Sequence, residues 1–196
     1  MIHSTDAGWS WNSRGPASLA APQPELSRWL QDTGSLTERL RLCCRHFRVQ
    51  LQCTRAQVSL TPEQADWLGG EHAHCREVLL LCDEQPWVYA SSLYSSAALQ
   101  ALPALGGLGE RALGELMFEH PDLTRSDFDF AQLTANQWWQ LAQQQNLTQP
   151  ALGVSASPQA DAPNRLPWAR RSLLAIPRAS VLVTELFLPA AQAYKE

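Results

Sequence analysis

The chain has 196 residues, of which 45% are hydrophobic and 17% charged, the composition of one globular domain with its own core. Fifteen Lys and Arg residues against 19 Asp and Glu residues give a net charge of −4, and no basic stretch is long enough to predict a nucleic-acid or anionic-membrane surface. No apolar run approaches the roughly 20 residues that span a bilayer, and residues 1–21 lack the apolar core of a signal peptide. We therefore expect a cytoplasmic protein that binds neither nucleic acid nor membrane.

Residues 1–24 carry Gly, Pro and Ser without clear periodicity, which predicts a loosely ordered arm with Trp9 and Trp11 able to lie on the core. A first helix is expected to begin near Pro24. Ser35-Leu-Thr-Glu38 is a capping-box pattern, so a second helix should follow and run to about His46. The side chains expected to face inward from this second helix are Leu36, Leu40 and Cys43.

Three stretches predict strands by their pattern. Residues 48–54 alternate with period two, as in a half-exposed antiparallel strand. Residues 75–82 are almost wholly apolar, and residues 87–94 follow a turn signal, which indicates a buried hairpin. A last hairpin is expected from residues 168–176, a turn at Pro177-Arg178, and the stretch that ends at Pro189. Together with the helices, this pattern predicts an α+β domain with an antiparallel sheet.

Two charges stand inside these apolar strands. Glu185 shares a strand face with Val183 and Phe187, and Arg76 shares one with Val78. A carboxylate on an apolar face costs several kcal/mol unless a cation, a donor or a ligand meets it. A structural ion pair and a ligand-binding site both remain open for each residue.

Two other motifs contain residue types that are common in cofactor and metal sites. The stretch Gly106-Gly-Leu-Gly109 matches neither a dinucleotide loop nor a P-loop, and indicates a loop before a helix that begins near Ala112. Free N–H groups at such a start can hold a carboxylate. His72-Ala-His-Cys75 lacks a second half at zinc spacing, so we predict no metal and no cofactor. The five cysteines form no CxxC pair and are expected to be reduced core residues: Cys43, Cys44, Cys53, Cys75 and Cys82.

The second half of the chain is more polar. Residues 123–130 alternate and predict a strand, and residues 137–141 predict a short helical piece. Residues 143–164 are rich in Gln, Ala, Pro, Ser and Gly, which predicts a mobile surface insertion. The predicted domain therefore runs from 25 to 190 and carries this insertion.

Several short motifs stand in the order found in one known family, and the chain resembles chorismate pyruvate-lyase over about residues 25–142 and 164–190. The resemblance implies a single α+β domain with a six-stranded antiparallel sheet, and a monomer without cofactors. The matching motifs are Ser35-Leu-Thr37, Arg76-Glu-Val-Leu-Leu80, Pro86-Trp87, Ala112-Leu-Gly114, Leu123-Thr-Arg125, Arg170-Arg-Ser172 and Thr184-Glu-Leu-Phe-Leu-Pro189.

The resemblance also implies a reaction and a site. The reaction is the conversion of chorismate to 4-hydroxybenzoate and pyruvate, the first step of ubiquinone biosynthesis. Arg76 would hold the ring carboxylate, and Glu185 would meet the oxygen end of the ring, as the two catalytic residues. The backbone N–H groups of Leu36 and Leu113 would assist in substrate binding. Both leucines stand at predicted helix starts, where N–H groups are free.

The chain departs from the family pattern at Ser91, where the family carries an arginine after the residue that matches Ala90. Chorismate has a second carboxylate, so a cation at position 91 would help to hold it, and Ser91→Arg is expected to raise kcat/KM. Arg125, Arg170 or Arg171 could supply that cation instead. The alternative function is a non-catalytic binding domain for an aromatic carboxylate such as 4-hydroxybenzoate, because some transcription regulators use the same fold for effector binding.

Overall fold

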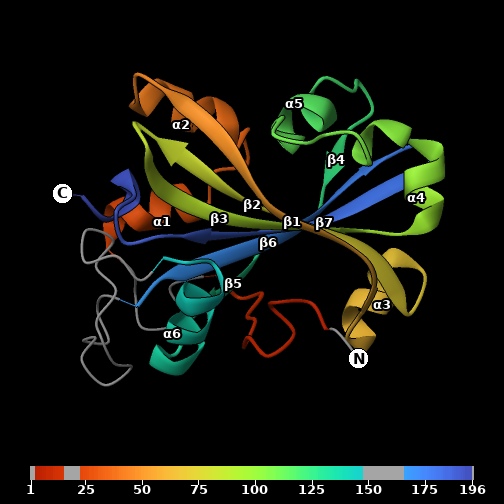
Figure 1. Ribbon diagram of the computed structural model, residues 1–196, viewed down its shortest axis with the longest axis horizontal. Helices are drawn as coiled ribbons and strands as arrows, with labels where there is room; N and C mark the ends of the chain where they lie inside the picture. Colours follow the sequence, from red (N-terminus) through yellow and green to blue (C-terminus); the bar gives the residue numbers. More distant parts are fainter. Residues whose placement is uncertain (1–2, 16–22, 148–165, 196) are drawn as a thin grey trace.

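A computed structural model describes residues 3–15, 23–147 and 166–195. Its centre is an antiparallel sheet in the order β1-β2-β3-β7-β6-β4, with β5 also paired to β6 (Figure 1). The predicted α+β class with an antiparallel sheet is confirmed. The strands are β1 (Phe47–Ser59), β2 (His72–Cys82), β3 (Gln85–Tyr94), β4 (Thr124–Arg125), β5 (Asp129–Gln132), β6 (Trp168–Ile176) and β7 (Ala179–Phe187).

The sheet has seven strands in the described part of the chain, where six were expected. The stretch 123–130, predicted as one strand, contributes to two short ones. β4 pairs with Leu174 and Ala175 of β6, and β5 pairs with residues 168–171 of the same strand. The two pieces therefore share one edge of the sheet, and the chain between them leaves the β-ladder.

Helices cover both faces of the sheet (Figure 1). The side chains of α1, α2, α4 and α5 pack on the face that carries Val181, Val183 and Phe187. α3, α6 and the N-terminal segment pack on the opposite face. None of the described helices is long and apolar enough to cross a membrane. The helices are α1 (Pro24–Leu30), α2 (Leu36–Cys43), α3 (Pro62–Leu68), α4 (Ser96–Ala101), α5 (Leu113–Phe118) and α6 (Ala135–Gln144), with 3-10 turns η2 (Pro103–Leu105) and η6 (Gln192–Tyr194).

The predicted start of α2 is confirmed, but its predicted end is wrong. The Ser35 hydroxyl accepts a hydrogen bond from the Glu38 backbone N–H at 3.4 Å. The helix ends at Cys43, because Cys44 takes an extended conformation and leads the chain toward β1. Cys43 is consequently exposed rather than buried. Among the five free cysteines, only Cys75 and Cys82 are fully buried.

Residues 3–15 pack more closely than the loose arm that their composition predicts. Asp6 is buried and accepts hydrogen bonds from Gln64 Nε2 at 3.1 Å and from Thr184 Oγ1 at 2.9 Å. Trp9 is also buried. These two polar contacts and one large aromatic side chain thus hold this segment on the second face of the sheet. The rest of the expected arm, apart from Gln23 and Pro24, lies outside the described residues.

The predicted start of the insertion, residue 143, lies too early in the chain. The helix predicted near residues 137–141 is α6, which runs through Gln144, and Leu147 is buried against Trp138 and its neighbours. A capping box between Thr134 and Gln137 stabilises the start of this helix. Residues 143–147 therefore belong to the packed domain, and residues 148–164 lie outside the described part.

Candidate active site

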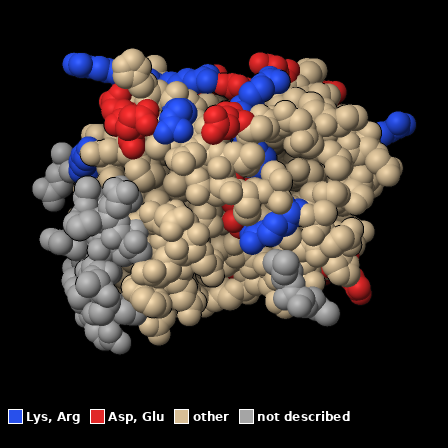
Figure 2. Space-filling view, viewed as in Figure 1, with Lys and Arg blue, Asp and Glu red and all other residues tan. Residues whose placement is uncertain are grey.

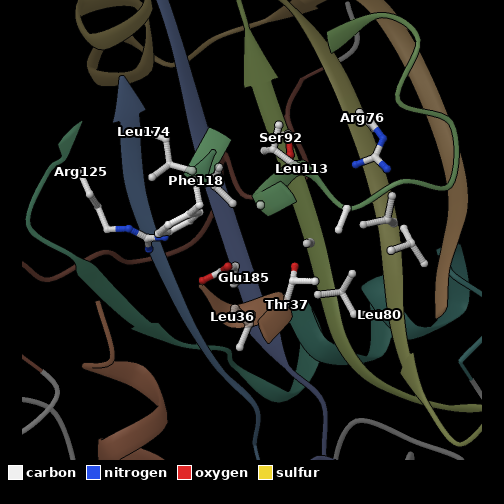
Figure 3. Close-up of a pocket in the computed structure, with 16 residues that line it drawn as sticks. Leu36, Thr37, Arg76, Leu80, Ser92, Leu113, Phe118, Arg125, Leu174 and Glu185 are labelled. Carbon is white, nitrogen blue, oxygen red and sulfur yellow. The ribbon is translucent and has the colours of Figure 1, made fainter. Parts of the chain in front are cut away.

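A pocket lies between the sheet and the first turns of α2 and α5, with an empty volume of about 500 Å³ (Figure 3). That volume includes space open to solvent, so the space that the walls enclose is smaller. Most of its wall is apolar, and its charged residues are few: Arg76, Arg125 and Glu185. The full lining is Leu36, Thr37, Val49, Arg76, Val78, Leu80, Ala90, Ser92, Ala112, Leu113, Gly114, Phe118, Arg125, Leu174, Val183 and Glu185.

The two helix starts meet over the pocket. Leu36 and Leu113 are the first helical residues of α2 and α5, so their backbone N–H groups have no acceptor within the helix. A Cβ atom at Gly114 would lie 3.1 Å from Thr37 Oγ1, so the glycine permits this close approach. An ion pair between Arg41 and Glu115 also links the helices. Figure 2 shows opposite charges side by side along the edge of the molecule that carries α2 and α5.

Arg76 of β2 is held at one side of the pocket and is 2% exposed. Its Nη2 atom donates to the carbonyl oxygens of Gly109 at 2.9 Å and Arg111 at 2.7 Å. These carbonyls belong to the loop before α5, which includes the glycine-rich stretch. The Nε atom of Arg76 is buried without a hydrogen-bond partner among the described residues. Burial lowers the pKa of this guanidinium, because desolvation disfavours the charged form.

Glu185 of β7 is 8% exposed and lines the pocket. Its Oε2 atom accepts a hydrogen bond from Arg170 Nε at 2.6 Å. The Nη1 atom of Arg170 donates to carbonyl oxygens at the C-terminal end of α1, including those of Trp29 at 3.0 Å and Asp32 at 2.6 Å. Such carbonyls carry the negative end of the helix dipole and suit a cation. Glu185 is therefore both part of a buried ion pair and part of the pocket wall.

The structure brings together all four residues singled out in the sequence. Arg76, Glu185, Leu36 and Leu113 line one pocket, although they come from four separate elements. Arg125, which the sequence indicates only as one possible substitute for a cation at position 91, lines the same pocket from β4. The alternation of residues 123–130 predicts a strand there but does not say which of its faces meets a pocket.

The expectation that Ser91 borders the pocket is wrong. Ala90 and Ser92 line the pocket, and because side chains alternate along a strand, Ser91 points to the other face of the sheet. It is 2% exposed, lies 3.7 Å from Cys75 Sγ, and pairs in register with Glu77 of β2. An arginine at position 91 would therefore stand beside Glu77 and not beside a ligand in the pocket.

In this chain Arg55 of β1 supplies the cation for Glu77. The two side chains form an ion pair, and Glu77 also accepts from Thr5 Oγ1 at 2.5 Å and Cys53 Sγ at 3.1 Å. Burial alone would raise the pKa of Glu77, but the hydrogen bonds and the Arg55 charge lower it. Glu77, the register neighbour of Ser91, therefore already has a cation in this chain.

Ser91→Arg is accordingly expected to leave kcat/KM for chorismate within about threefold of the unmodified protein. The new side chain must enter a packed layer that already holds the Arg55–Glu77 pair, and overpacking typically costs about 1–3 kcal/mol. We expect a lower melting temperature together with unchanged steady-state kinetics. A rise in kcat/KM of tenfold or more would contradict the assignment of Ser91 to the far face.

The described residues contain no group of three or more His, Cys, Asp or Glu side chains placed to hold a metal ion. In the stretch His72-Ala-His-Cys75, His74 stacks on Tyr94 with ring centroids 5.7 Å apart, and its Nε2 atom lies 3.1 Å from Ser96 Oγ. His72 is exposed. His74 is therefore held by side chains of the protein, and His72 is the first residue of β2.

Solved structures of low sequence identity share this fold. The effector domain of PhnF from Mycobacterium smegmatis matches with a TM-score of 0.52 at 15% identity, covering 85% of this chain and 91% of that one. Full-length PhnF matches with the same TM-score, covering 80% of this chain and 64% of that one. At this identity the likeness shows the fold alone.

Sequence comparison is more specific. The family model described as chorismate lyase matches residues 8–196. A probable chorismate pyruvate-lyase from Pseudoalteromonas atlantica is 32% identical over 194 residues, covering 95% of this chain and 90% of that protein. Another, from Cupriavidus pinatubonensis, is 37% identical over 185 residues, covering 91% and 88%. The chain therefore belongs to the chorismate lyase family.

Proposed function

We propose that this protein is a chorismate lyase, which converts chorismate to 4-hydroxybenzoate and pyruvate in ubiquinone biosynthesis. The observation that carries the proposal is the placement of Arg76 and Glu185 on two strands that face one pocket (Figure 3). β3 lies between their strands, and Glu185 is two residues along β7 from the position in line with Arg76. Strand spacing then separates the two Cα atoms by about 12 Å. A six-membered ring with polar groups at its two ends fits between the side chains.

The protein contributes to this reaction mainly by orienting the substrate and by stabilising the charge that develops on it. The C3–O bond of the ether breaks with its electron pair leaving on the enolpyruvyl oxygen. The C4 hydrogen leaves as a proton, and its bonding electrons complete the aromatic ring. A proton delivered to the methylene carbon of the released enolate gives pyruvate. Aromatisation drives these steps, so holding the diene in a reactive conformer and stabilising the departing charge suffice for catalysis.

Each site residue has a place in this scheme. Arg76 binds the ring carboxylate, with its buried Nε donor directed at the ligand and its Nη2 donor held by the loop carbonyls. Glu185, oriented by Arg170, meets the C4 hydroxyl, where a carboxylate can accept a hydrogen bond or receive the C4 proton. The N–H groups of Leu36 and Leu113 add donors on the helix side of the pocket.

A non-catalytic binding domain for 4-hydroxybenzoate is the second candidate, favoured only by the shared fold. Incubation of the purified protein with chorismate separates the two. We expect equal amounts of 4-hydroxybenzoate and pyruvate to accumulate, also in buffer that contains a strong chelator. Tight binding of 4-hydroxybenzoate with no turnover would support the binding domain and overturn the lyase.

Glu185→Gln is expected to lower kcat by about a hundredfold or more, because the amide cannot receive a proton and presents only one acceptor. The affinity for 4-hydroxybenzoate should stay within about tenfold, since Arg76 and the ring contacts are retained. Steady-state kinetics and titration calorimetry on the same preparation measure both. An unchanged kcat would show that Glu185 has no catalytic role.

The proposed enzyme acts as a monomer in the cytoplasm. Light scattering coupled to size-exclusion chromatography checks the mass in solution, for which about 22 kDa is expected from the sequence mass of 21.8 kDa.

A further inference from the structure

A second arginine enters the same pocket from the side opposite Arg76 (Figure 3). Arg125 of β4 has its guanidinium carbon 5.2 Å from the ring centroid of Phe118 and 5.0 Å from that of Phe128. Its Nη1 atom donates to Ser172 Oγ at 3.3 Å. Its Nε atom is buried and has no hydrogen-bond partner in the described part of the chain. A buried donor of this kind is costly unless a ligand satisfies it.

The neighbouring arginines of β6 are already engaged. Arg170 donates to Glu185 and to the end of α1, so its charge is neutralised within the protein. Arg171 points to the other face of the sheet, where it pairs with Glu63 at 2.5 Å and Asp129 at 3.0 Å. Of the three arginines that could meet a second carboxylate, only Arg125 has a free donor in the pocket.

The charges of the site favour a ligand with two negative groups. Arg76, Arg125 and Glu185 line the pocket, and the carboxylate of Glu185 is paired with Arg170, which is not among the lining residues. The positive charges of Arg76 and Arg125 therefore remain on opposite sides of a mostly apolar pocket. A monocarboxylate satisfies one of them, and a dicarboxylate satisfies both.

We propose that Arg125 forms a second carboxylate subsite, which binds the carboxylate of the enolpyruvyl arm of the substrate and of the pyruvate that leaves. This inference rests on the proposed function and deepens it. Phe118 and Phe128 hold the guanidinium flat, so that its Nε edge is presented to a carboxylate at the C3 side of the ring. Arg125 is thereby the residue that distinguishes the substrate from its aromatic product, which keeps only the carboxylate at Arg76.

The test compares two unreactive ligands that differ by one carboxylate: 3-(carboxymethoxy)-4-hydroxybenzoate and 4-hydroxy-3-methoxybenzoate. Titration calorimetry on the unmodified protein is expected to show tighter binding of the dicarboxylate by about ten- to a hundredfold, the size of a charge-assisted hydrogen bond. Arg125→Gln should remove this preference while changing the affinity for the methoxy ligand by less than about threefold. Arg125→Lys, which keeps the charge without the fork, should retain part of it.

Arg48→Gln is the matched control, because Arg48 is an exposed arginine paired with Glu84 outside the pocket. It should keep the full preference for the dicarboxylate. If Arg125→Gln melts like the unmodified protein and still prefers the dicarboxylate, the subsite is overturned. An equal loss of affinity for both ligands, with the Arg125→Lys variant behaving the same way, would likewise overturn it.

Turnover distinguishes this inference from the function on which it rests. Failure of the unmodified protein to convert chorismate would overturn the lyase, whereas the binding preference would still report on the subsite. If turnover is observed, Arg125→Gln should raise KM for chorismate by about tenfold or more, while product affinity stays nearly constant. A KM that does not change would contradict the subsite and leave the lyase intact.

Discussion

Arg76→Ala is expected to lower the affinity for 4-hydroxybenzoate by about thirtyfold to several thousandfold, equivalent to about 2–5 kcal/mol. The ring carboxylate would enter a pocket with apolar walls and lose its charged donor, while the carbonyls of Gly109 and Arg111 would lose theirs. Titration calorimetry measures the loss directly. The effect should be larger than that of any other single substitution in the pocket, because Arg76 anchors the one charged group that substrate and product share.

The same substitution at an exposed site provides the comparison. Arg48→Ala removes a guanidinium from β1 that pairs with Glu84 in solvent, and surface pairs contribute little. Its affinity for 4-hydroxybenzoate should match that of the unmodified protein. If Arg76→Ala binds the product equally well in this comparison, the ring carboxylate lies elsewhere in the pocket.

Arg170→Met is expected to destabilise the protein by about 3–5 kcal/mol, because it leaves Glu185 as an uncompensated charge in a buried site. For a chain of this length, that loss lowers the melting temperature by about 6–20 °C. The carbonyl oxygens at the end of α1 also lose their donor, so this helix should loosen first. Thermal unfolding followed by circular dichroism measures the change.

A double variant distinguishes the contribution of the Arg170–Glu185 charges to stability from that of side-chain packing. Arg170→Met with Glu185→Met removes both charges and replaces them with apolar side chains of adaptable shape. We expect it to be more stable than Arg170→Met alone, since a buried pair replaced as a unit is often nearly neutral. A double variant that unfolds at the lower temperature of the single one would show that the carbonyl contacts, and not the charge of Glu185, carry the effect.

Local patterns were enough to predict the parts of the site that depend on one strand or one helix end. An unbroken apolar run with one charge predicts a buried strand that carries a residue in need of a partner, which holds for both Arg76 and Glu185. Helix starts at Leu36 and near Leu113 follow from a capping pattern and from a loop before an apolar stretch. Strand alternation also predicted correctly which side of β7 faces the pocket.

Contacts between distant segments required the tertiary structure. Nothing near Glu185 in the chain identifies Arg170 as its partner, and the choice among Arg125, Arg170 and Arg171 depends on where β4, β5 and β6 meet. The error at Ser91 has the same origin. Strand alternation places Ser91 on the face opposite Ala90, but the pocket face of β3 was known only from the structure. The ion pair of Arg55 with Glu77 likewise depends on the register of β1 on β2.

Strand period, helix capping and motif order depend on residues that are close together in the chain, so local patterns were sufficient to predict the fold class, the two buried charges and the family. Which cation pairs with which anion, and which donors remain free for a ligand, became clear only from the placement of the strands. Ion pairs and hydrogen bonds act over a few ångströms in space, so their partners are set by the register of strands that are far apart in the chain.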